Sequence, residues 1–383
     1  MAARQDTLSR YGQTMAAIPG VTHPRVAVIF GGVGPEHGVS CLSARSITSA
    51  LVDLGFPVTC IGISPNGVWR KVAVEDVLSF SVVDNVLPFV SSDGHPVQLS
   101  MDPTLPGFHV GSEFISCRVA FPIVHGVGGE DGQLQGVLDS AGISYVGSGV
   151  EASAISMNKV TTKRVVQSSG VGGGTWIEVT QATSPREVST RVAELGSDAY
   201  FVKPASGGSS AGITKVSASS DLREAIRAAF SVSDRVIIEA AISQPRELEV
   251  AVLDVGGSLS ASPVGEIRLH PDFEFYDFTA KYLAHGAELV VPADLDPEIA
   301  NEIRTRAIDI FRLLGCRDYV RVDFFLDKDS TIIFNEINTA PGFTDISMYS
   351  RMWEAGGISF ADLVHQLVAN AGARSTSTPE AGS

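Results

Sequence analysis

The chain has 383 residues, with 28 Lys and Arg against 43 Asp and Glu, and therefore a formal net charge of −15. Apolar residues make up 44% of the sequence and charged residues 19%, which is a globular rather than a disordered composition. The acidic balance argues against a general nucleic-acid binder, because such affinity comes from Lys and Arg neutralising phosphates. At this length more than one domain is expected.

Cysteine usage and the start of the chain bear on its location. The four cysteines show no CxxC spacing, so neither a disulfide framework nor a zinc site is predicted. Residues 1–20 lack the apolar stretch of a secretory signal, and no segment is apolar over the length that a membrane helix needs. We therefore expect a cytoplasmic protein that binds neither membrane nor nucleic acid.

The first part of the chain alternates strand-like and helix-like segments, which favours an α/β (α+β) fold. Polar residues 1–24 precede it and are expected to form a flexible extension. Strands are predicted at residues 25–30, 58–63 and 118–124, and helices at residues 39–54 and 134–140. Residues 70–115 show weak periodicity and are expected to be an insertion or irregular strands.

The character of the sequence changes near residue 150 and again near residue 246. Residues 152–168 are predicted to form one helix, and residues 200–204 and 236–242 to form strands. In the third region, the last long helix is predicted to begin after Asp296, a good N-cap, and to stop at Gly315. The small residues 372–383 are expected to form a flexible tail.

Two glycine-containing segments are candidates for phosphate binding. Residues 32–37 begin like the dinucleotide fingerprint GxGxxG, but His37 occupies the third Gly position, which disfavours a dehydrogenase. The chain contains no Gly-Lys pair, so a Walker P-loop is excluded. The better candidate is Lys203 with residues 204–212, whose backbone N–H groups, hydroxyls and ammonium suit a polyphosphate. A flexible linker is the other interpretation of this loop.

A predicted hairpin at residues 319–338 gathers oxygen-bearing side chains. Residues 319–326 alternate, so that Arg321 and Asp323 share one face of a strand. After a turn, the chain pairs back and places Glu336 and Asn338 together on one face of the second strand. Asp323, Glu336 and Asn338 then form an all-oxygen set suited to Mg²⁺ shared with nucleotide phosphates. A solvated sheet face is the alternative, but the apolar neighbours of these residues favour burial, and buried acids need a cationic partner.

Seven segments follow one another along the chain: RVAVIFGGVGPEHGVS, HGVGGEDGQLQG, YVGSGVEASAISMNK, VKPASGGSSAG, YDFTAKYL, RVDFFLD and NEINTAPGFTDIS. In these segments and in their order, the sequence resembles a known family, the D-alanine–D-alanine ligases of the ATP-grasp superfamily. The match runs from about residue 25 to residue 368. An ordered series of this kind is far more specific than any single motif.

The resemblance implies an ATP-grasp fold of three domains, with ATP between two antiparallel sheets. We expect an N-terminal α/β substrate-binding domain at residues 25–149, a central ATP-grasp domain at 150–243 and a C-terminal catalytic domain at 244–371. The implied reaction joins two D-alanine molecules to D-alanyl-D-alanine through D-alanyl phosphate, giving ADP and phosphate, for peptidoglycan precursor synthesis. The implied cofactors are ATP and two Mg²⁺ ions, for which Mn²⁺ can substitute. A homodimer is expected by resemblance only.

The resemblance also assigns roles to individual residues. The implied nucleotide-binding residues are Lys159, Lys203, Ser209, Ser210, Glu239, Ala241, Ile242, Glu247, Tyr276, Lys281, Asn335 and Glu336. The implied metal ligands are Asp323, Glu336 and Asn338, in agreement with the hairpin argument. The implied substrate-binding residues are Glu36, His125, Lys281, Arg321, Ser347 and Met348. The implied catalytic residues are Glu36, Ser209, Tyr282, Arg321 and Gly342, where Arg321 and the Gly342 N–H are the oxyanion donors and Tyr282, Ser209 and Glu36 close a lid.

The acceptor remains open at this stage. In the resembled family, Tyr at position 282 accompanies D-alanine as acceptor, whereas Phe accompanies D-lactate. Gly38, Ala340 and residues 172–174 depart from the family pattern and could enlarge or soften the pocket. A ligase using D-serine or D-lactate is therefore the nearest rival. A non-catalytic nucleotide-binding regulator is disfavoured, because every charged group that the chemistry needs is present.

Overall fold

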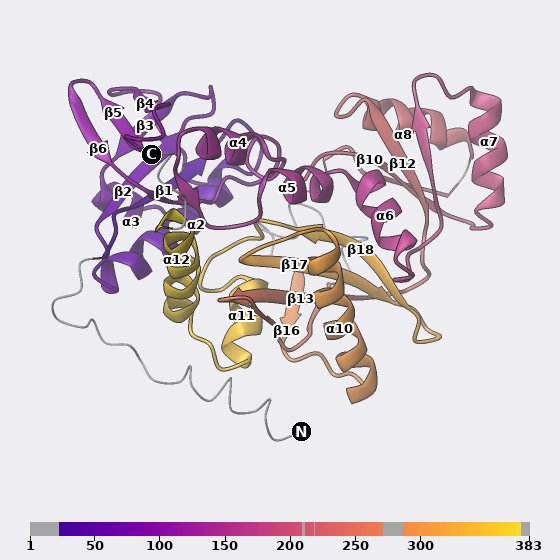
Figure 1. The fold of residues 1–383 in the computed structure, drawn as a ribbon. Helices are drawn as coiled ribbons and strands as arrows, with labels where there is room; N and C mark the ends of the chain where they lie inside the picture. The colour runs from indigo at the N-terminus through magenta and orange to yellow at the C-terminus, as the bar shows by residue number, and fades with distance from the viewer. Residues whose placement is uncertain (1–22, 209–210, 218, 271–285, 377–383) are drawn as a thin grey trace, which may run out of the picture.

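The computed structural model describes residues 23–208, 211–217, 219–270 and 286–376. Figure 1 shows three regions: an indigo N-terminal part, a central part that projects to the right, and an orange C-terminal sheet between and below them. The two antiparallel sheets that the resemblance implies are present, and the predicted α/β architecture is confirmed. The division at residues 149/150 and 243/244 stays a prediction.

The N-terminal part is built on a five-stranded sheet in the order β3-β2-β1-β7-β8. Strands β2, β1, β7 and β8 run parallel, and β3 is an antiparallel edge. The strands span Val26–Gly31 (β1), Val58–Ile63 (β2), Trp69–Val72 (β3), Val119–Pro122 (β7) and Ser144–Tyr145 (β8). Helices α2 (His37–Asp53) and α4 (Gln133–Ser140) pack on this sheet. All three predicted strands and both predicted helices of this part are confirmed.

The weakly periodic stretch at residues 70–115 does form irregular strands. It contains a short helix, α3 (Val74–Leu78), and a separate three-stranded antiparallel sheet. That sheet consists of β4 (Val97–Leu99), β5 (Gly107–Val110) and β6 (Glu113–Ser116). Strands of three or four residues are too short to show clear alternation in the sequence.

The helix predicted at residues 152–168 is two helices, α5 (Val150–Met157) and α6 (Lys159–Ser168). Asn158 separates them, because its backbone is extended (φ −94°, ψ 98°). Its side-chain Oδ1 accepts the N–H of Thr161 at 3.0 Å and so caps α6. The single-helix prediction was wrong because a good N-cap residue stood inside the periodic pattern.

The central part is a four-stranded antiparallel sheet in the order β11-β10-β12-β9. Its strands span Trp176–Thr180 (β9), Tyr200–Pro204 (β10), Thr214–Val216 (β11) and Arg235–Ala240 (β12). Helices α7 (Pro185–Glu194) and α8 (Ser219–Phe230) cover one face of this sheet. The other face of this sheet points toward the C-terminal sheet.

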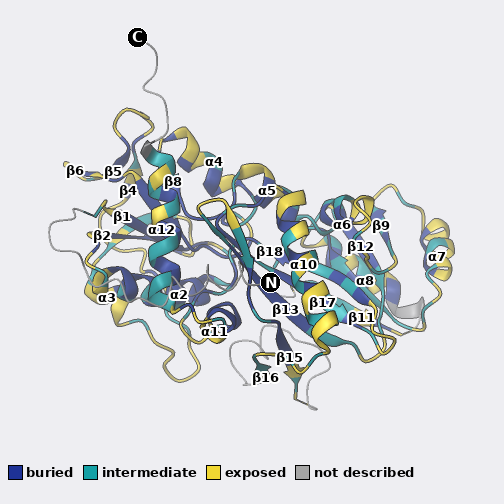
Figure 2. Cartoon of the chain, turned by 60° about the horizontal axis from the view of Figure 1, so that its bottom comes forward, coloured by how far each residue is buried: buried dark blue, intermediate teal, exposed yellow. Residues whose placement is uncertain are grey.

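The C-terminal sheet is antiparallel, in the order β16-β15-β13-β17-β18, with β14 paired to β13. Its strands span Arg246–Val255 (β13), Ser258–Ala261 (β14), Gly265–Leu269 (β15), Ala287–Val290 (β16), Tyr319–Leu326 (β17) and Ile332–Asn338 (β18). Helix α10 (Pro297–Leu313) packs on one face, and its predicted cap is confirmed: Asp296 Oδ1 accepts the N–H of Glu298 at 2.8 Å. Figure 2 shows β13 and β17, in the middle of this sheet, largely buried, whereas the outer face of α10 is exposed.

Two further helices follow this sheet, α11 (Met348–Ala355) and α12 (Phe360–Thr376). Helix α12 packs against α2, β7 and β8, so the end of the chain returns to the N-terminal sheet (Figure 1). The helix at Asp296 is therefore not the last long one. The predicted tail at 372–383 was also wrong for residues 372–376, which continue α12, and Ala371 beside them is fully buried.

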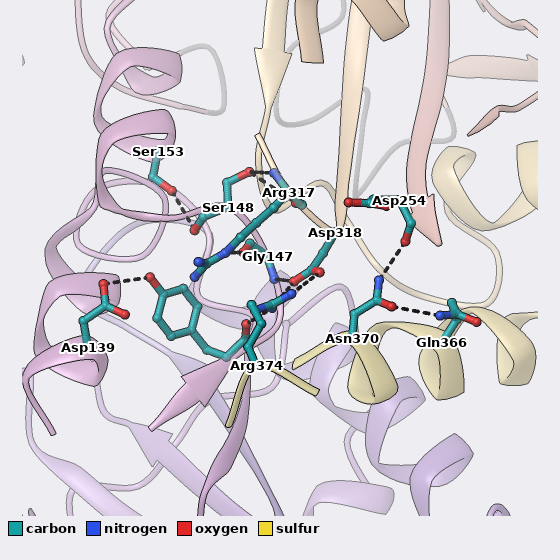
Figure 3. A network of polar contacts seen from close by, with 11 residues as sticks. Asp139, Gly147, Ser148, Ser153, Asp254, Arg317, Asp318, Gln366, Asn370 and Arg374 are labelled. Atoms are coloured by element: carbon teal, nitrogen blue, oxygen red, sulfur yellow. Dashed lines mark hydrogen bonds and ion pairs between the residues drawn. The ribbon is translucent and has the colours of Figure 1, made fainter. Parts of the chain in front are cut away.

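A polar network fastens α12 to the start of β17 (Figure 3). Asp318, whose residue is only 1% exposed, accepts the N–H of Gly147 at 2.7 Å and two N–H groups of Arg374 at 2.8 and 2.6 Å. Arg317 donates to the Gly147 carbonyl at 2.9 Å and lies over the Tyr145 ring. One carboxylate thus joins the N-terminal sheet, α12 and the strand that carries Arg321.

Candidate active site

Two adjacent cavities lie where the three parts of the chain meet. The first, of about 830 Å³, is lined by the N-terminal part, by the C-terminal sheet and by the loop after β18. The second, of about 430 Å³, lies between the two antiparallel sheets. Glu249, Arg321 and Glu336 line both cavities. The two cavities therefore adjoin at these three side chains.

Every predicted site residue that the structure describes lines one of these cavities. The first cavity takes Glu36, His125, Lys159, Arg321, Glu336, Asn338, Gly342, Ser347 and Met348. The second takes Lys203, Glu239, Ala241, Ile242, Glu247, Arg321, Asp323, Asn335 and Glu336. Ser209, Ser210, Tyr276, Lys281 and Tyr282 lie outside the described residues.

A cluster of charged side chains lines the second cavity. Glu239 on β12 accepts from Lys203 of β10 at 2.5 Å and from Lys163 of α6 at 2.7 Å. Burial alone would raise the pKa of Glu239, but the two ammonium groups outweigh it and lower that pKa to about 2. Sequence reasoning missed Lys163, although it lies one helical turn after Lys159 and therefore on the same face of α6.

Lys159 lines the first cavity, close to Glu336, which lines both cavities. Its Nζ donates to the Gly207 carbonyl at 2.9 Å and is 3.8 Å from Glu336. Burial lowers the pKa of Lys159, and the carboxylate of Glu336 offsets this only in part. Lys159 and Lys203 thus provide two ammonium groups beside the loop that begins at Pro204, as a polyphosphate requires.

The three predicted metal ligands do share one face of the hairpin. Asp323 and Glu336 are directly opposed across β17 and β18, and the Asn338 amide donates to Asp323 Oδ2 at 3.0 Å. In the described part of the chain, no group of three or more His, Cys, Asp or Glu side chains could hold a metal ion. The set consists instead of two carboxylates and one amide, which fits Mg²⁺ when phosphate oxygens and waters complete the coordination.

Arg321 is held by two carboxylates, of which the sequence analysis identified one. Its Nε and Nη2 each donate to Asp323 at 2.7 Å, and its Nε lies 3.2 Å from Glu249 Oε2. Burial opposes the charge on Arg321, but these carboxylates outweigh it and raise the pKa of the guanidinium well above its ordinary value. Glu249 and Asp323 are register partners on β13 and β17. In the sequence, the feature that could have identified Glu249 is its position two residues after Glu247.

His125 also lines the first cavity, and both of its ring nitrogens have a hydrogen-bond partner. Its Nδ1 donates to the Ala340 carbonyl at 2.9 Å, and its Nε2 lies 3.3 Å from Ser43 Oγ. Burial lowers the pKa of His125, which favours the neutral ring. Shielding from water and the nearby carboxylate of Glu36 raise the pKa of Glu130 to about 8. Glu130 was not among the predicted residues.

Gly38 does not enlarge this cavity, contrary to the expectation from the sequence. A Cβ atom built at Gly38 would lie 2.4 Å from the Cβ of Leu87. The space that a larger residue would occupy is therefore filled by the segment after α3. Val82 and Asn85 of the same segment line the first cavity.

The charge on Glu239 should make stability depend on acid pH. Because its folded-state pKa of about 2 lies below the ordinary 4.5, the group contributes stability that is present above about pH 4.5 and lost as pH falls toward 2. The difference corresponds to about 3 kcal/mol. We expect Glu239→Gln to be less stable than the parent at pH 5, with the gap closing toward pH 3, in urea unfolding. Glu302→Gln, in an exposed ion pair, serves as control, and a gap independent of pH would contradict the assignment.

Comparison with known proteins supports one family. Family profiles described as D-ala D-ala ligase N-terminus and C-terminus match residues 25–148 and 165–369. A D-alanine–D-alanine ligase of Nocardia farcinica is 45% identical over 361 residues, covering 92% of this chain and 98% of the relative. One of Mycolicibacterium smegmatis is 43% identical over 370 residues, covering 94% and 97%.

Solved structures agree with these relatives. The D-alanine-D-alanine ligase of Coxiella burnetii superposes with a TM-score of 0.80 at 31% identity, covering 93% of this chain and 96% of that one. The VanG D-Ala:D-Ser ligase of Enterococcus faecalis gives a TM-score of 0.79 at 32% identity, covering 91% and 99%. The chain therefore belongs to the D-alanine–D-alanine ligase family, ATP-dependent enzymes of ATP-grasp fold that form D-alanyl-D-alanine for peptidoglycan synthesis.

Proposed function

We propose that the residues of the two cavities carry out this ligation in two steps, with D-alanyl phosphate as the intermediate. The observation that carries the proposal is the boundary shared by the cavities, where Glu249, Arg321 and Glu336 line both. A nucleotide between the sheets would present its γ-phosphoryl group to an amino acid in the first cavity at this boundary. ATP cleavage and peptide formation can then occur without a covalent enzyme intermediate.

In the first step, the carboxylate of the donor D-alanine attacks the γ-phosphoryl group of ATP, and ADP leaves. Glu36 binds the donor's ammonium group, and Lys159 and Lys203 bind the phosphates, which keeps the reactants in line. Asp323, Glu336 and Asn338 would hold Mg²⁺, whose charge offsets that of the phosphates. In support of this assignment, Lys159 lines the first cavity and Lys203 the second, on the two sides of the proposed transfer site.

In the second step, the amine of the acceptor D-alanine attacks the acyl carbon, and phosphate leaves. The acceptor carboxylate is placed by Ser347 and Met348 at the start of α11. The oxyanion of the tetrahedral intermediate receives donors from Arg321 and from the Gly342 N–H. Arg321 is well placed for this role, because its two carboxylate contacts fix the guanidinium at the boundary of the cavities.

We further propose that Ser209, Ser210, Tyr276 and Lys281 bind the nucleotide, and that Tyr282 joins Ser209 and Glu36 to close a lid over the intermediate. This rests on the matching motifs VKPASGGSSAG and YDFTAKYL. A closed lid would keep water from the acyl phosphate, which it would otherwise hydrolyse.

The test of the function is product formation from D-alanine alone. With ATP and Mg²⁺, we expect equal molar amounts of phosphate and D-alanyl-D-alanine, measured by a phosphate assay and mass spectrometry. L-alanine in place of D-alanine is the control and should give neither. Phosphate release without dipeptide would overturn the proposal.

The acceptor is the finer question, since a D-Ala:D-Ser ligase is among the similar structures. We propose D-alanine, because Tyr282 accompanies D-alanine use in the resembled family. With D-alanine and D-serine present in equal amounts, D-alanyl-D-alanine should be the main product. A majority of D-alanyl-D-serine would favour the rival ligase.

We propose that the enzyme acts as a homodimer in the cytoplasm. All four cysteines are buried and unpaired, which fits a reducing compartment, and ATP is available there. Among the helices in the described part of the chain, none is long and apolar enough to cross a membrane. The dimer rests on family resemblance alone, and a monomer in analytical ultracentrifugation would refute it.

A further inference from the structure

The loop that follows β18 is held by the N-terminal part of the chain at both polar atoms of one residue. Glu130 Oε1 accepts the N–H of Ala340 at 2.9 Å, and His125 Nδ1 donates to the carbonyl of the same residue at 2.9 Å. Ser43 Oγ accepts the N–H of Phe343 at 3.4 Å. Residues 339–343 follow β18 of the C-terminal sheet, but the side chains that hold them belong to the N-terminal part of the chain.

Glu130 is itself fixed in place. Its Oε2 accepts the N–H of Gly126 at 2.7 Å, while its own N–H donates to the Gly126 carbonyl at 2.8 Å. Gly126 has φ +74°, and a Cβ atom at Gly129 would lie 2.0 Å from the Val124 carbonyl oxygen. Both positions thus favour glycine, and the tight loop that they allow aims the Glu130 carboxylate at Ala340.

These contacts affect the position of the Gly342 N–H, which is one of the two proposed oxyanion donors. An oxyanion donor must lie about 2.7–3.1 Å from the developing charge to be effective. Ala340 is held at its N–H and its carbonyl, and the ring of Pro341 fixes the next φ angle. The bonds to Ala340 on one side of Gly342 and to the Phe343 N–H on the other therefore restrict the direction of the Gly342 N–H.

We propose that Glu130 is a positioning residue for the second chemical step, which sets the Gly342 N–H through its bond to Ala340. The inference rests on the proposed function, because it presupposes an oxyanion at this place. Glu130 does not touch the γ-phosphoryl group in this account, so its loss should leave the first step nearly unchanged. That selectivity separates a positioning role from a general structural one.

The test is Glu130→Gln, whose side chain has the same length but retains only one accepting oxygen for two N–H groups. We expect kcat for dipeptide formation to fall by about a hundredfold, the effect of an approximately 1 Å misplacement. The first step is followed in the same reaction by D-alanine-dependent positional isotope exchange in ATP labelled with ¹⁸O at the β,γ-bridge. Its rate should be unchanged, so that exchange per dipeptide formed rises.

Asp131→Asn is the matched control. Asp131 lies in the same loop and, among the residues that the structure describes, bonds only within it, to the N–H groups of Gly128 and Gln133 and to the Gln133 side chain. It should leave both rates unchanged. If Glu130→Gln does not fold, Glu130→Asp keeps a carboxyl group on a shorter side chain, which no longer reaches the Ala340 N–H in the same way, and should show the same selective loss.

Three outcomes decide the matter. A selective loss of dipeptide formation supports the inference. An equal fall of exchange and dipeptide formation, or no change in either, overturns it. If the parent enzyme shows neither exchange nor dipeptide, the proposed function fails, and that result is distinct from an effect of Glu130.

Discussion

Replacing Arg321 with alanine is expected to lower kcat for dipeptide formation by about a hundredfold to a thousandfold, the usual effect of removing one oxyanion donor. The guanidinium lies at the boundary of the two cavities and lines both. It is not among the groups proposed to hold the phosphates. The affinity for a non-hydrolysable ATP analogue, measured by calorimetry, should therefore stay nearly constant. An equal loss of nucleotide affinity would make Arg321 a binding residue instead.

The same substitution should also destabilise the protein, which the sequence did not suggest. Without Arg321, Asp323 and Glu249 lose their shared cationic partner. Leaving a buried charge without its partner costs about 3–5 kcal/mol. Arg312→Ala, in an exposed pair with Asp309, is the control, and its free energy of unfolding should change by less than about 1 kcal/mol. Equal stability of the two variants would contradict the arrangement of charges around Arg321.

Asp318→Ala is expected to lower the free energy of unfolding by about 1–3 kcal/mol, because it removes the bidentate partner of Arg374, whose side chain is 31% exposed and keeps its bond to the Tyr145 carbonyl. The N–H of Gly147 loses its acceptor at the same time. Because this network joins α12 to β17 and to the N-terminal sheet (Figure 3), the variant should begin to unfold at a lower urea concentration than the parent.

The control for Asp318→Ala is Asp309→Ala, which removes a carboxylate that is 53% exposed at its side chain. It should change the free energy of unfolding by less than about 1 kcal/mol. A similarly small effect of Asp318→Ala would show that α12 is held by its apolar face alone, through residues such as Leu363 and Leu367.

The hairpin was predictable because its signals are local. Alternation placed Arg321 and Asp323 on one face, and the turn placed Glu336 opposite Asp323, as the register shows. The sequence could not show that Asp323 is already engaged by Arg321, because that depends on side-chain conformation. Nor did alternation reveal the bulge between Asp323 and Phe324.

The residues missed were those whose roles arise from contacts distant in sequence. Glu130 meets Ala340 across 210 positions, and no local pattern marks such a contact. Lys163 and Glu249 had local signals, namely one helical turn from Lys159 and two strand positions from Glu247. Residues 372–376 were assigned to a tail because they are mostly small or polar and show no apolar periodicity. They belong to α12, whose apolar face packs on β7 and β8.

The most direct test of the central claim is the fate of the donor's carboxylate oxygens. With D-alanine labelled by ¹⁸O in its carboxylate, activation by phosphoryl transfer predicts one ¹⁸O in every phosphate released, because the oxygen that attacked phosphorus leaves with it. The dipeptide should keep one label in its amide carbonyl. Unlabelled phosphate would show that water, and not the amino acid, receives the phosphoryl group, and would contradict ligation through D-alanyl phosphate.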